Sequence, residues 1–273
     1  MTAVSFIGYG DIATRTSTAL ILSSYTKMRG LCRYPELKDN PAHVELIAGD
    51  AANAADIERA VTAETEVIIM TLTPNRQSDD SYYNGYVVPA RILQNHLQTN
   101  GWEPRIIFVS STGVYGQRDG SWVDETSPAE PNDQAGKSLL QAEQIIASAS
   151  PHTSILRCSG IYGPERTRLA ELLISGEGTI TPAWTNRIHA DDVAGFIAYL
   201  VQHPEKSQPV FLVSDDEPLL QEDAYGRLAK RLGIDLRTIA RSEAIGRRGS
   251  KRISNRLLHA SGYQLIHPTY EPR

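Results

Sequence analysis

The sequence has little of what several protein classes require. It holds two cysteines, Cys32 and Cys158, among 273 residues, too few for a disulfide framework or a cysteine-rich zinc site, and we expect no metal site. No apolar run reaches the length of a membrane span, and the N-terminus lacks the basic and apolar regions of a signal peptide. We therefore expect a soluble, cytoplasmic protein with no membrane partner.

An excess of positive charge is also missing. Lys and Arg number 27 and Asp and Glu 32, which gives a net charge of −5. Nucleic acids select proteins with the opposite balance, so no nucleic-acid partner is expected and a small-molecule substrate is favoured. The local exception is the basic stretch 241–256, which is either a solvated charge run or a phosphate site for a nucleotide-linked substrate.

Short apolar runs and helical patterns alternate over the first 158 residues. Strands are expected at 3–8, 27–33, 44–49, 66–72, 105–111 and 153–158, and helices at about 11–23, 53–63, 80–99 and 134–149. Continuous apolar strands alternating with helices indicate a parallel sheet covered on both faces. The predicted fold class is α/β, a Rossmann-type doubly wound parallel sheet.

The regular alternation of strands and helices ends after residue 158. Helices are expected at 165–175, 191–202 and 221–233, with one more strand at 208–215. This pattern predicts a small C-terminal substrate domain interleaved with the sheet. The dinucleotide-binding domain would comprise 1–158 plus 189–215, and the substrate domain 159–188 plus 216–273.

The first strand–helix junction carries a glycine motif, "GYGDIA" at 8–13. Gly8 permits the tight turn, Gly10 lets the backbone approach a pyrophosphate, and Ala13 keeps helix and strand close. The N–H groups of Asp11 and Ile12 would then meet the pyrophosphate at the helix N-terminus. The motif predicts binding of NAD or NADP.

Two residues bear on which dinucleotide is bound. Arg33 ends the second strand, where an NAD-specific site usually has an acidic residue, and a guanidinium there suits the 2′-phosphate of NADP. NADP is therefore preferred over NAD, the alternative being that Arg33 is a solvated surface residue. Asp50 follows the third strand and either meets the adenine edge or caps a turn.

Later motifs carry a family resemblance. "FVSSTGVYG" (108–116), "ILRCSGIYGP" (155–164) and "RIHADDVA" (187–194), behind a glycine motif, resemble the extended short-chain dehydrogenase/reductase superfamily, in its NAD-dependent epimerase/dehydratase group. The stretches 213–219 and 251–270 resemble an atypical branch of that group. The resemblance covers essentially the whole chain.

The resemblance implies several site residues. Ser111 takes the place of a catalytic Ser or Thr, with Thr112 beside it, and Tyr115 lies near the substrate pocket. The local alternative is a strand-end Ser that caps a turn and a Tyr that packs on its loop. The loop at 71–75 would face the nicotinamide half of the cofactor through Thr71, Leu72 and Thr73.

The resemblance also predicts an absence. Family members carry Tyr-x-x-x-Lys on the helix expected at 134–149, and these positions fall on Ala135 and Leu139. Lys137 is two residues from each and about 200° around the helix axis from Ala135, so it does not replace the pair. Another proton route would be needed, with Tyr115, Tyr162 and His189 as candidates.

Two functions follow. The first is an NAD(P)-binding, epimerase/dehydratase-like oxidoreductase that acts on a carbonyl or nucleotide-linked sugar with an atypical active site. The second is a non-catalytic NADP(H)-binding sensor or regulatory module. Relatives often form dimers through the helices corresponding to 80–99 and 134–149, so a homodimer is a further expectation.

Overall fold

The structure is a computed structural model that describes residues 2–21, 27–38, 43–74 and 80–272. Residues 22 and 23 of the helix expected at 11–23, and Asn75 of the loop expected at 71–75, lie outside the described residues. Clustering of contacts divides the chain into two compact units. The first unit comprises 1–110, 133–157 and 194–211, and the second comprises 111–132, 158–193 and 212–273.

A seven-stranded sheet, counted over the described residues, organises the first unit, in the order β12-β7-β5-β4-β1-β2-β3. The strands are β1 (Ala3–Ile7), β2 (Lys27–Cys32), β3 (Val44–Ala48), β4 (Thr65–Met70), β5 (Arg105–Ser111), β7 (Thr153–Cys158) and β12 (Val210–Val213). β1 pairs in parallel with β2 and β4, placing Phe6 beside Gly30 and Ile69. This is the predicted Rossmann-type parallel sheet.

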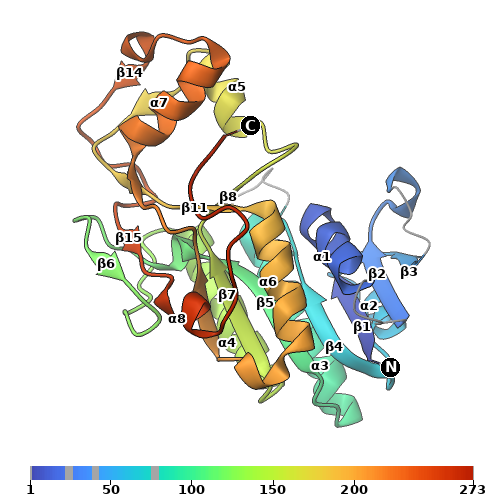
Figure 1. The fold of residues 1–273 in the computed structure, drawn as a ribbon. Helices are drawn as coiled ribbons and strands as arrows, with labels where there is room; N and C mark the ends of the chain where they lie inside the picture. The colour runs from blue at the N-terminus through green and yellow to red at the C-terminus, as the bar shows by residue number, and fades with distance from the viewer. Residues whose placement is uncertain (1, 22–26, 39–42, 75–79, 273) are drawn as a thin grey trace. The chain divides into compact units, whose positions relative to one another are not determined.

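The strand sequences explain why the sheet is covered on both faces. In β4, the side chains of 67–70 are all buried, and Val4 and Phe6 of β1 are at most 1% exposed. A strand with one wet face would alternate buried and exposed side chains, so a continuous apolar run indicates helices on both faces. In Figure 1, α1 (Asp11–Ile21) and α6 (Ala190–Gln202) lie in front of the strands.

The remaining helices of this unit pack against one another. α3 (Val88–Asn100) contacts both α2 (Ala54–Ala60) and α4 (Gln134–Ala149). α3 ends at Gly101, which adopts the left-handed conformation with φ 66°, a position where glycine carries no steric penalty. The side chain of Asp133 caps α4 by accepting the N–H of Gly136 at 2.7 Å.

The helix expected at 80–99 is not continuous. A turn of π-helix, η2 (Tyr83–Val87), precedes α3. Pro89 has no N–H to donate to the carbonyl of Gly85, so the regular i to i−4 pattern cannot run through this point. Gly85 is also close to Pro74, whose Cβ would lie 2.8 Å from a Cβ added at Gly85.

The second unit is built from short elements. Its helices are α5 (Arg168–Ile174), α7 (Gln221–Leu232) and α8 (Arg256–Ala260), and its strands are β6 (Trp122–Val123), β8 (Gly160–Tyr162), β9 (Thr179–Ile180), β10 (Trp184–Thr185), β11 (Arg187–His189), β13 (Leu219–Leu220), β14 (Ala240–Arg241) and β15 (Arg252–Ile253). A hydrophobic cluster that includes Leu173 of α5 and Leu228 of α7 forms its core. The boundaries of the two contact units differ from those of the predicted domains. The division into a dinucleotide-binding and a substrate domain stays a prediction.

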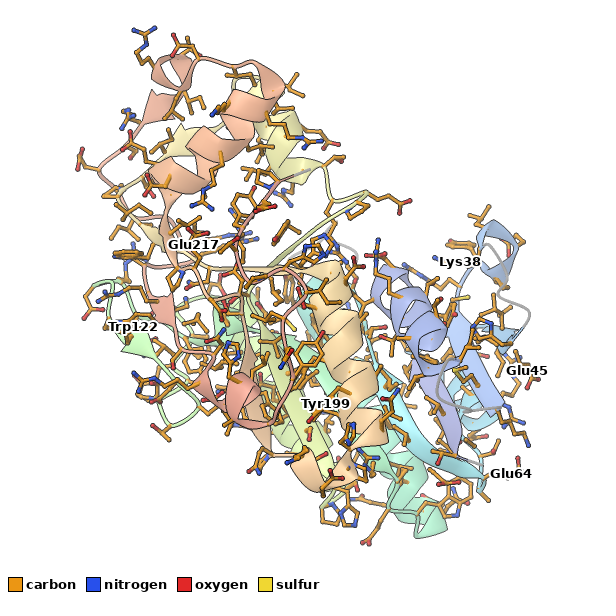
Figure 2. The ribbon with its side chains drawn as sticks, viewed as in Figure 1. Lys38, Glu45, Glu64, Trp122, Tyr199 and Glu217 are labelled. Carbon is orange, nitrogen blue, oxygen red and sulfur yellow. The ribbon has the colours of Figure 1, made fainter. Side chains whose placement is uncertain are left out.

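The surface of the first unit carries exposed ion pairs. Glu64 pairs with Lys27, and Glu45 pairs with Arg29 at 3.0 Å; Figure 2 shows both glutamates at the periphery. Exposed pairs of this kind contribute about 0–1 kcal/mol, so they say little about function. Among the described residues, no helix combines the length and the apolar character that crossing a bilayer requires.

Candidate dinucleotide site

The turn between β1 and α1 is held from both sides. The N–H of Gly8 donates to the carbonyl of Leu31 in β2 at 3.1 Å, and the hydroxyl of Thr71 donates to the carbonyl of Gly8 at 2.5 Å. Gly8 has φ 86°, and a Cβ there would lie 3.1 Å from the Thr71 carbonyl oxygen. Gly8 is therefore required both by its backbone conformation and by the close approach of the loop after β4.

The start of α1 is open where a phosphate would approach. A Cβ added at Gly10 would meet no heavy atom within 4 Å. The first intrahelical bond runs from the N–H of Thr14 to the carbonyl of Gly10 at 2.9 Å, and an α-helix leaves the N–H groups before that bond without intrahelical acceptors. The residues present therefore fit a dinucleotide whose pyrophosphate lies against Gly10 and the N-terminus of α1, at Asp11 and Ile12.

A buried tyrosine that the glycine motif does not indicate supports this turn. Tyr9 is 2% exposed, and its hydroxyl hydrogen-bonds Ser17 of α1 at 2.6 Å. Its ring lies over Gly30 of β2, where an added Cβ would be only 2.5 Å away. The isolated glycine within an apolar strand was the available signal, since such a glycine often marks a close approach. Ala13 is fully buried, as the glycine motif requires.

The residues that would select the cofactor lie in the first unit. Arg33 is exposed directly after β2, with its guanidinium 6.0 Å from the ring of Tyr34. The Asp50 carboxylate accepts the N–H of Ala52 at 2.9 Å, which is the turn-capping alternative. An adenine contact by Asp50 stays a prediction.

The loop after β4 is only partly available to a ligand. Thr71 uses its hydroxyl on Gly8, as described, and the side chain of Leu72 lies 3.1 Å from the Cβ position of Gly8. Thr73 is exposed. The predicted contacts of these three residues with a nicotinamide remain predictions.

The predicted catalytic residues of the second unit make local contacts. Ser111 ends β5, and its oxygen accepts the N–H of Gly113 at 3.1 Å. Thr112 is buried. The Tyr115 hydroxyl, also buried, donates to the carbonyl of Asp124 at 3.2 Å. These contacts correspond to the local alternatives, and they leave the hydroxyl proton of Ser111 able to be donated.

The helix α4 places three further predicted positions. Ala135 is half-buried, Leu139 is 3% exposed and Lys137 is exposed. An alanine methyl and a buried leucine side chain carry no ionisable group, so neither position offers acid/base chemistry.

A buried ion pair anchors the same helix. Glu143 of α4 and Arg157 of β7 are 2% and 7% exposed. Arg157 donates from Nη2 to Oε2 at 2.7 Å and from Nε to both carboxylate oxygens at 3.1 Å, and Ser110 donates to Oε1 at 2.5 Å. Sequence reasoning assigned no role to this pair, although an arginine within the apolar run "TSILRC" was a signal that a buried partner exists.

Two further residues considered as proton donors or acceptors, both in the second unit, already make hydrogen bonds to the backbone. The Tyr162 hydroxyl donates to the carbonyl of Thr269 at 3.0 Å, and burial raises the pKa of Tyr162 to about 12. The Nδ1 atom of His189 accepts the N–H of Asp191 at 3.2 Å. Tyr162 therefore keeps its proton at neutral pH, and both side chains position neighbouring backbone.

Comparison with known proteins adds to this geometry. The profile of a family described as NAD(P)H-binding matches residues 8–204. The chain belongs to this NAD(P)H-binding family. This chain resembles a solved structure described as an NAD-dependent epimerase/dehydratase from Methylobacillus flagellatus, with 33% identity and a TM-score of 0.79. The match covers 98% of this chain and 94% of that protein. The resemblance to the extended short-chain dehydrogenase/reductases is thereby confirmed.

Other relatives define how far the likeness reaches. The curated protein YeeZ of Escherichia coli K12 is 33% identical over 138 residues, which are 48% of this chain and 47% of YeeZ. The chain thus matches about half the length of that relative. A double mutant of the dTDP-glucose 4,6-dehydratase DesIV of Streptomyces venezuelae, in a structure with NAD bound, has 17% identity and a TM-score of 0.81 over 98% of this chain and 92% of its own. At that identity the likeness shows the fold alone.

Proposed function

We propose that this NAD(P)H-binding family member is an NADP-preferring, epimerase/dehydratase-like oxidoreductase that works without the usual Tyr-Lys pair. Its substrate would be a carbonyl compound or a nucleotide-linked sugar. The observation that carries the proposal is the free space beside Gly10 at the start of α1, next to a turn in which the Thr71 hydroxyl holds the Gly8 carbonyl.

The preference for NADP rests on the charges that follow β2. Arg33 is exposed there, and Lys38 is close enough that its charge acts on the thiol of Cys32 at the end of the strand. Figure 2 labels Lys38 beyond the end of β2. A guanidinium and an ammonium together suit the 2′-phosphate that distinguishes NADP from NAD.

The roles of the chain's own residues follow from their contacts. A bound nicotinamide cofactor supplies hydride transfer. Gly10 and the N-terminus of α1 hold the pyrophosphate, and the Ser111 hydroxyl donates a hydrogen bond to a substrate oxygen while the Gly113 N–H fixes the orientation of that hydroxyl. Ala135 and Leu139 supply no proton, so catalysis relies on orientation of the reactants and on a proton from another group.

Calorimetric titration with NADPH and NADH tests the cofactor assignment. We expect NADPH to bind more tightly than NADH, and Arg33→Ala to weaken NADPH while leaving NADH unchanged. The matched control is Arg59→Ala, an exposed arginine that pairs with Asp56 of its own helix. Equal loss for both cofactors, or equal affinities in the unmodified protein, would contradict the preference for NADP.

An assay of nicotinamide absorbance with carbonyl compounds and nucleotide sugars tests the reaction. We expect turnover with at least one compound and a loss of about 10²–10⁴ in rate for Ser111→Ala. Cofactor binding should persist in that variant, which separates a chemical defect from a folding defect.

A non-catalytic NADP(H) sensor is the second candidate. The observation that favours it is that the hydroxyls of Tyr115 and Tyr162 donate to backbone carbonyls, while Leu139 is buried. The sensor predicts NADPH binding with no turnover across the substrate panel. Turnover that depends on Ser111 would contradict it.

A further inference from the structure

A cluster of two histidines and an aspartate lies in the second unit, and none of the three is a predicted cofactor residue. His189 ends β11, Asp191 is in the first turn of α6, and His267 lies in the segment that precedes the C-terminus. One ligand atom from each lies within 4.8 Å of the other two. The imidazole rings of His189 and His267 have centroids 3.8 Å apart.

The separations between the Asp191 carboxylate and the two histidine nitrogens are close to those in a tetrahedral metal site. The Asp191 Oδ2 atom is 3.4 Å from Nδ1 of His189 and 3.6 Å from Nε2 of His267. With zinc bonds of about 2.0–2.1 Å, neighbouring ligand atoms of a tetrahedron lie about 3.3–3.4 Å apart. These two distances need to shorten by no more than a few tenths of an ångström for the ion to be bound, whereas one ligand atom of each residue is placed only within 4.8 Å of the other two.

The donor set narrows the kind of ion. Two imidazole nitrogens and one carboxylate oxygen suit zinc and neighbouring transition metals, whereas magnesium and calcium prefer oxygen ligands alone. Three protein ligands leave a fourth tetrahedral position for water or another ligand.

Buried groups fix the two imidazoles. Asp192 is fully buried, and its carboxylate accepts the backbone N–H groups of Ile266 at 2.6 Å and His267 at 2.9 Å. These bonds hold the backbone that carries the His267 side chain beside α6. The ring of Tyr162 packs edge-on against His189, with centroids 5.0 Å apart. The two histidines are thus positioned by the Asp192 carboxylate and by the Tyr162 ring.

Exposure and charge suit the entry of a cation. The Asp191 side chain is 40% exposed, whereas those of His189 and His267 are 3% and 16% exposed. The ion would thus approach from the Asp191 side. Two carboxylates, Asp191 and Asp192, stand in the first turn of α6 and oppose the positive end of the helix dipole.

One existing contact competes with metal binding. The Nδ1 atom of His189 accepts the Asp191 N–H at 3.2 Å, and this bond caps α6. In this bond Nδ1 is the acceptor, and a metal ion is likewise bound through the lone pair of a ring nitrogen. Binding of an ion would replace this long hydrogen bond with a metal–nitrogen bond.

We propose that His189 Nδ1, Asp191 Oδ2 and His267 Nε2 form a binding site for a divalent transition-metal ion, best matched by zinc. The scarcity of cysteine in the sequence indicated no metal site, and the three ligands are brought together only by the fold. The argument for this site uses none of the residues predicted to bind NADP, so either assignment stands without the other.

Cobalt absorption and zinc calorimetry on the full chain, stripped of metal with a chelator, test the site. We expect one Co²⁺ per chain with the strong visible bands of tetrahedral coordination, displaced by Zn²⁺. His267→Ala and Asp191→Asn should each lower the affinity for Zn²⁺ by at least about 100-fold, since even the loss of a residue that only supports a ligand lowers metal affinity 10–100-fold. Melting curves of both variants verify folding, and Asp191→Asn preserves the shape of the side chain.

The matched control is His259→Ala. His259 also pairs with an aspartate, Asp216, at 2.6 Å on the exposed surface, and it is outside the three-residue cluster. It should bind Zn²⁺ as the unmodified protein does. The proposal is overturned if Co²⁺ gives no saturable tetrahedral spectrum, if His267→Ala binds normally, or if His259→Ala loses as much affinity as His267→Ala; the first two results would make His189 a helix cap only.

Discussion

At the scale of single residues, Gly8 and Gly10 lie in the same turn but should respond differently to substitution by alanine. Gly8 has φ 86° and close neighbours, whereas a Cβ at Gly10 would meet nothing within 4 Å. Gly8→Ala should therefore cost about 1–2 kcal/mol of stability, the penalty of a side chain in the left-handed region. Gly10→Ala should change stability by less than about 0.5 kcal/mol and yet weaken NADPH by about tenfold or more.

Urea unfolding and NADPH titration of the two variants provide the comparison. If Gly10→Ala binds NADPH as tightly as the unmodified protein, the pyrophosphate does not lie where the glycine motif places it. An equal loss of stability in both variants would contradict the open space at Gly10.

Asp215 is a second residue whose surroundings predict a measurable property. It is 1% exposed, and its Oδ2 atom has no hydrogen-bond partner among the described residues. Burial raises the pKa of Asp215 from 3.8 to about 8. The folded protein therefore binds a proton that the unfolded chain releases between these two values, so the stabilising contribution is complete below the unfolded pKa and is lost as the pH rises through about 8.

Stability should fall with rising pH in this window, by at most about 1.4 kcal/mol per pH unit for one proton. Asp215→Asn carries no ionisable group, so its slope should be shallower and its stability above pH 8 should exceed that of the unmodified protein. Urea unfolding at roughly pH 5, 7 and 9 measures both slopes. Parallel slopes in the two proteins would show that Asp215 titrates normally.

At the scale of elements, apolar patterning was enough to predict the long strands. The strands expected at 105–111 and 153–158 are β5 and β7 with the same bounds, because each contains an apolar run that the sheet buries. The pair β6 and β15 could not be predicted. Each has two residues, and Trp122 pairs with Arg252 far along the chain, so no local periodicity marks either strand.

The candidate site residues also fall into those that the sequence alone indicates and those that only the fold brings together. The glycine motif is a local property of the backbone, so Gly8 and Gly10 were found from sequence. The cluster of His189, Asp191 and His267 was not, because its members become neighbours only when Asp192 binds the backbone near His267. A charge within an apolar strand, such as Arg157, indicates a buried partner but does not identify it.

The ion pair of Glu143 and Arg157 supports a prediction about the attachment of α4 to the sheet. Glu143→Leu should destabilise the protein by about 3–5 kcal/mol, because it leaves the Arg157 guanidinium buried without its carboxylate. The double variant Glu143→Leu with Arg157→Met should be less destabilised than the single variant, since no uncompensated charge remains.

Urea unfolding of both variants and of Glu45→Gln measures these effects. Glu45 pairs with Arg29 on the surface with 66% of its side chain exposed, so its substitution should cost no more than about 1 kcal/mol. A double variant as unstable as Glu143→Leu would mean that shape, and not charge, sets the loss.

At the scale of the whole molecule, the two contact units are interleaved in sequence. Each comprises three segments, so the chain passes between the units five times. The junctions fall inside elements: β5 changes unit after Ser110, and β12 changes after Phe211. An element that contributes residues to both units cannot melt in one and persist in the other, so we expect the chain to unfold in a single cooperative transition.

This connectivity gives a prediction for NADPH. A ligand that binds only the folded state stabilises it by RT ln(1 + [L]/Kd), about 2.7 kcal/mol at 100 times Kd. NADPH contacts predicted in the first unit should therefore raise the temperature of the whole calorimetric transition, including the second unit. For Gly10→Ala at the same NADPH concentration, a tenfold higher Kd leaves about 1.4 kcal/mol of stabilisation, so the shift should be roughly halved or smaller. Two separate transitions, of which NADPH moves only one, would show that the units are energetically independent despite their shared strands.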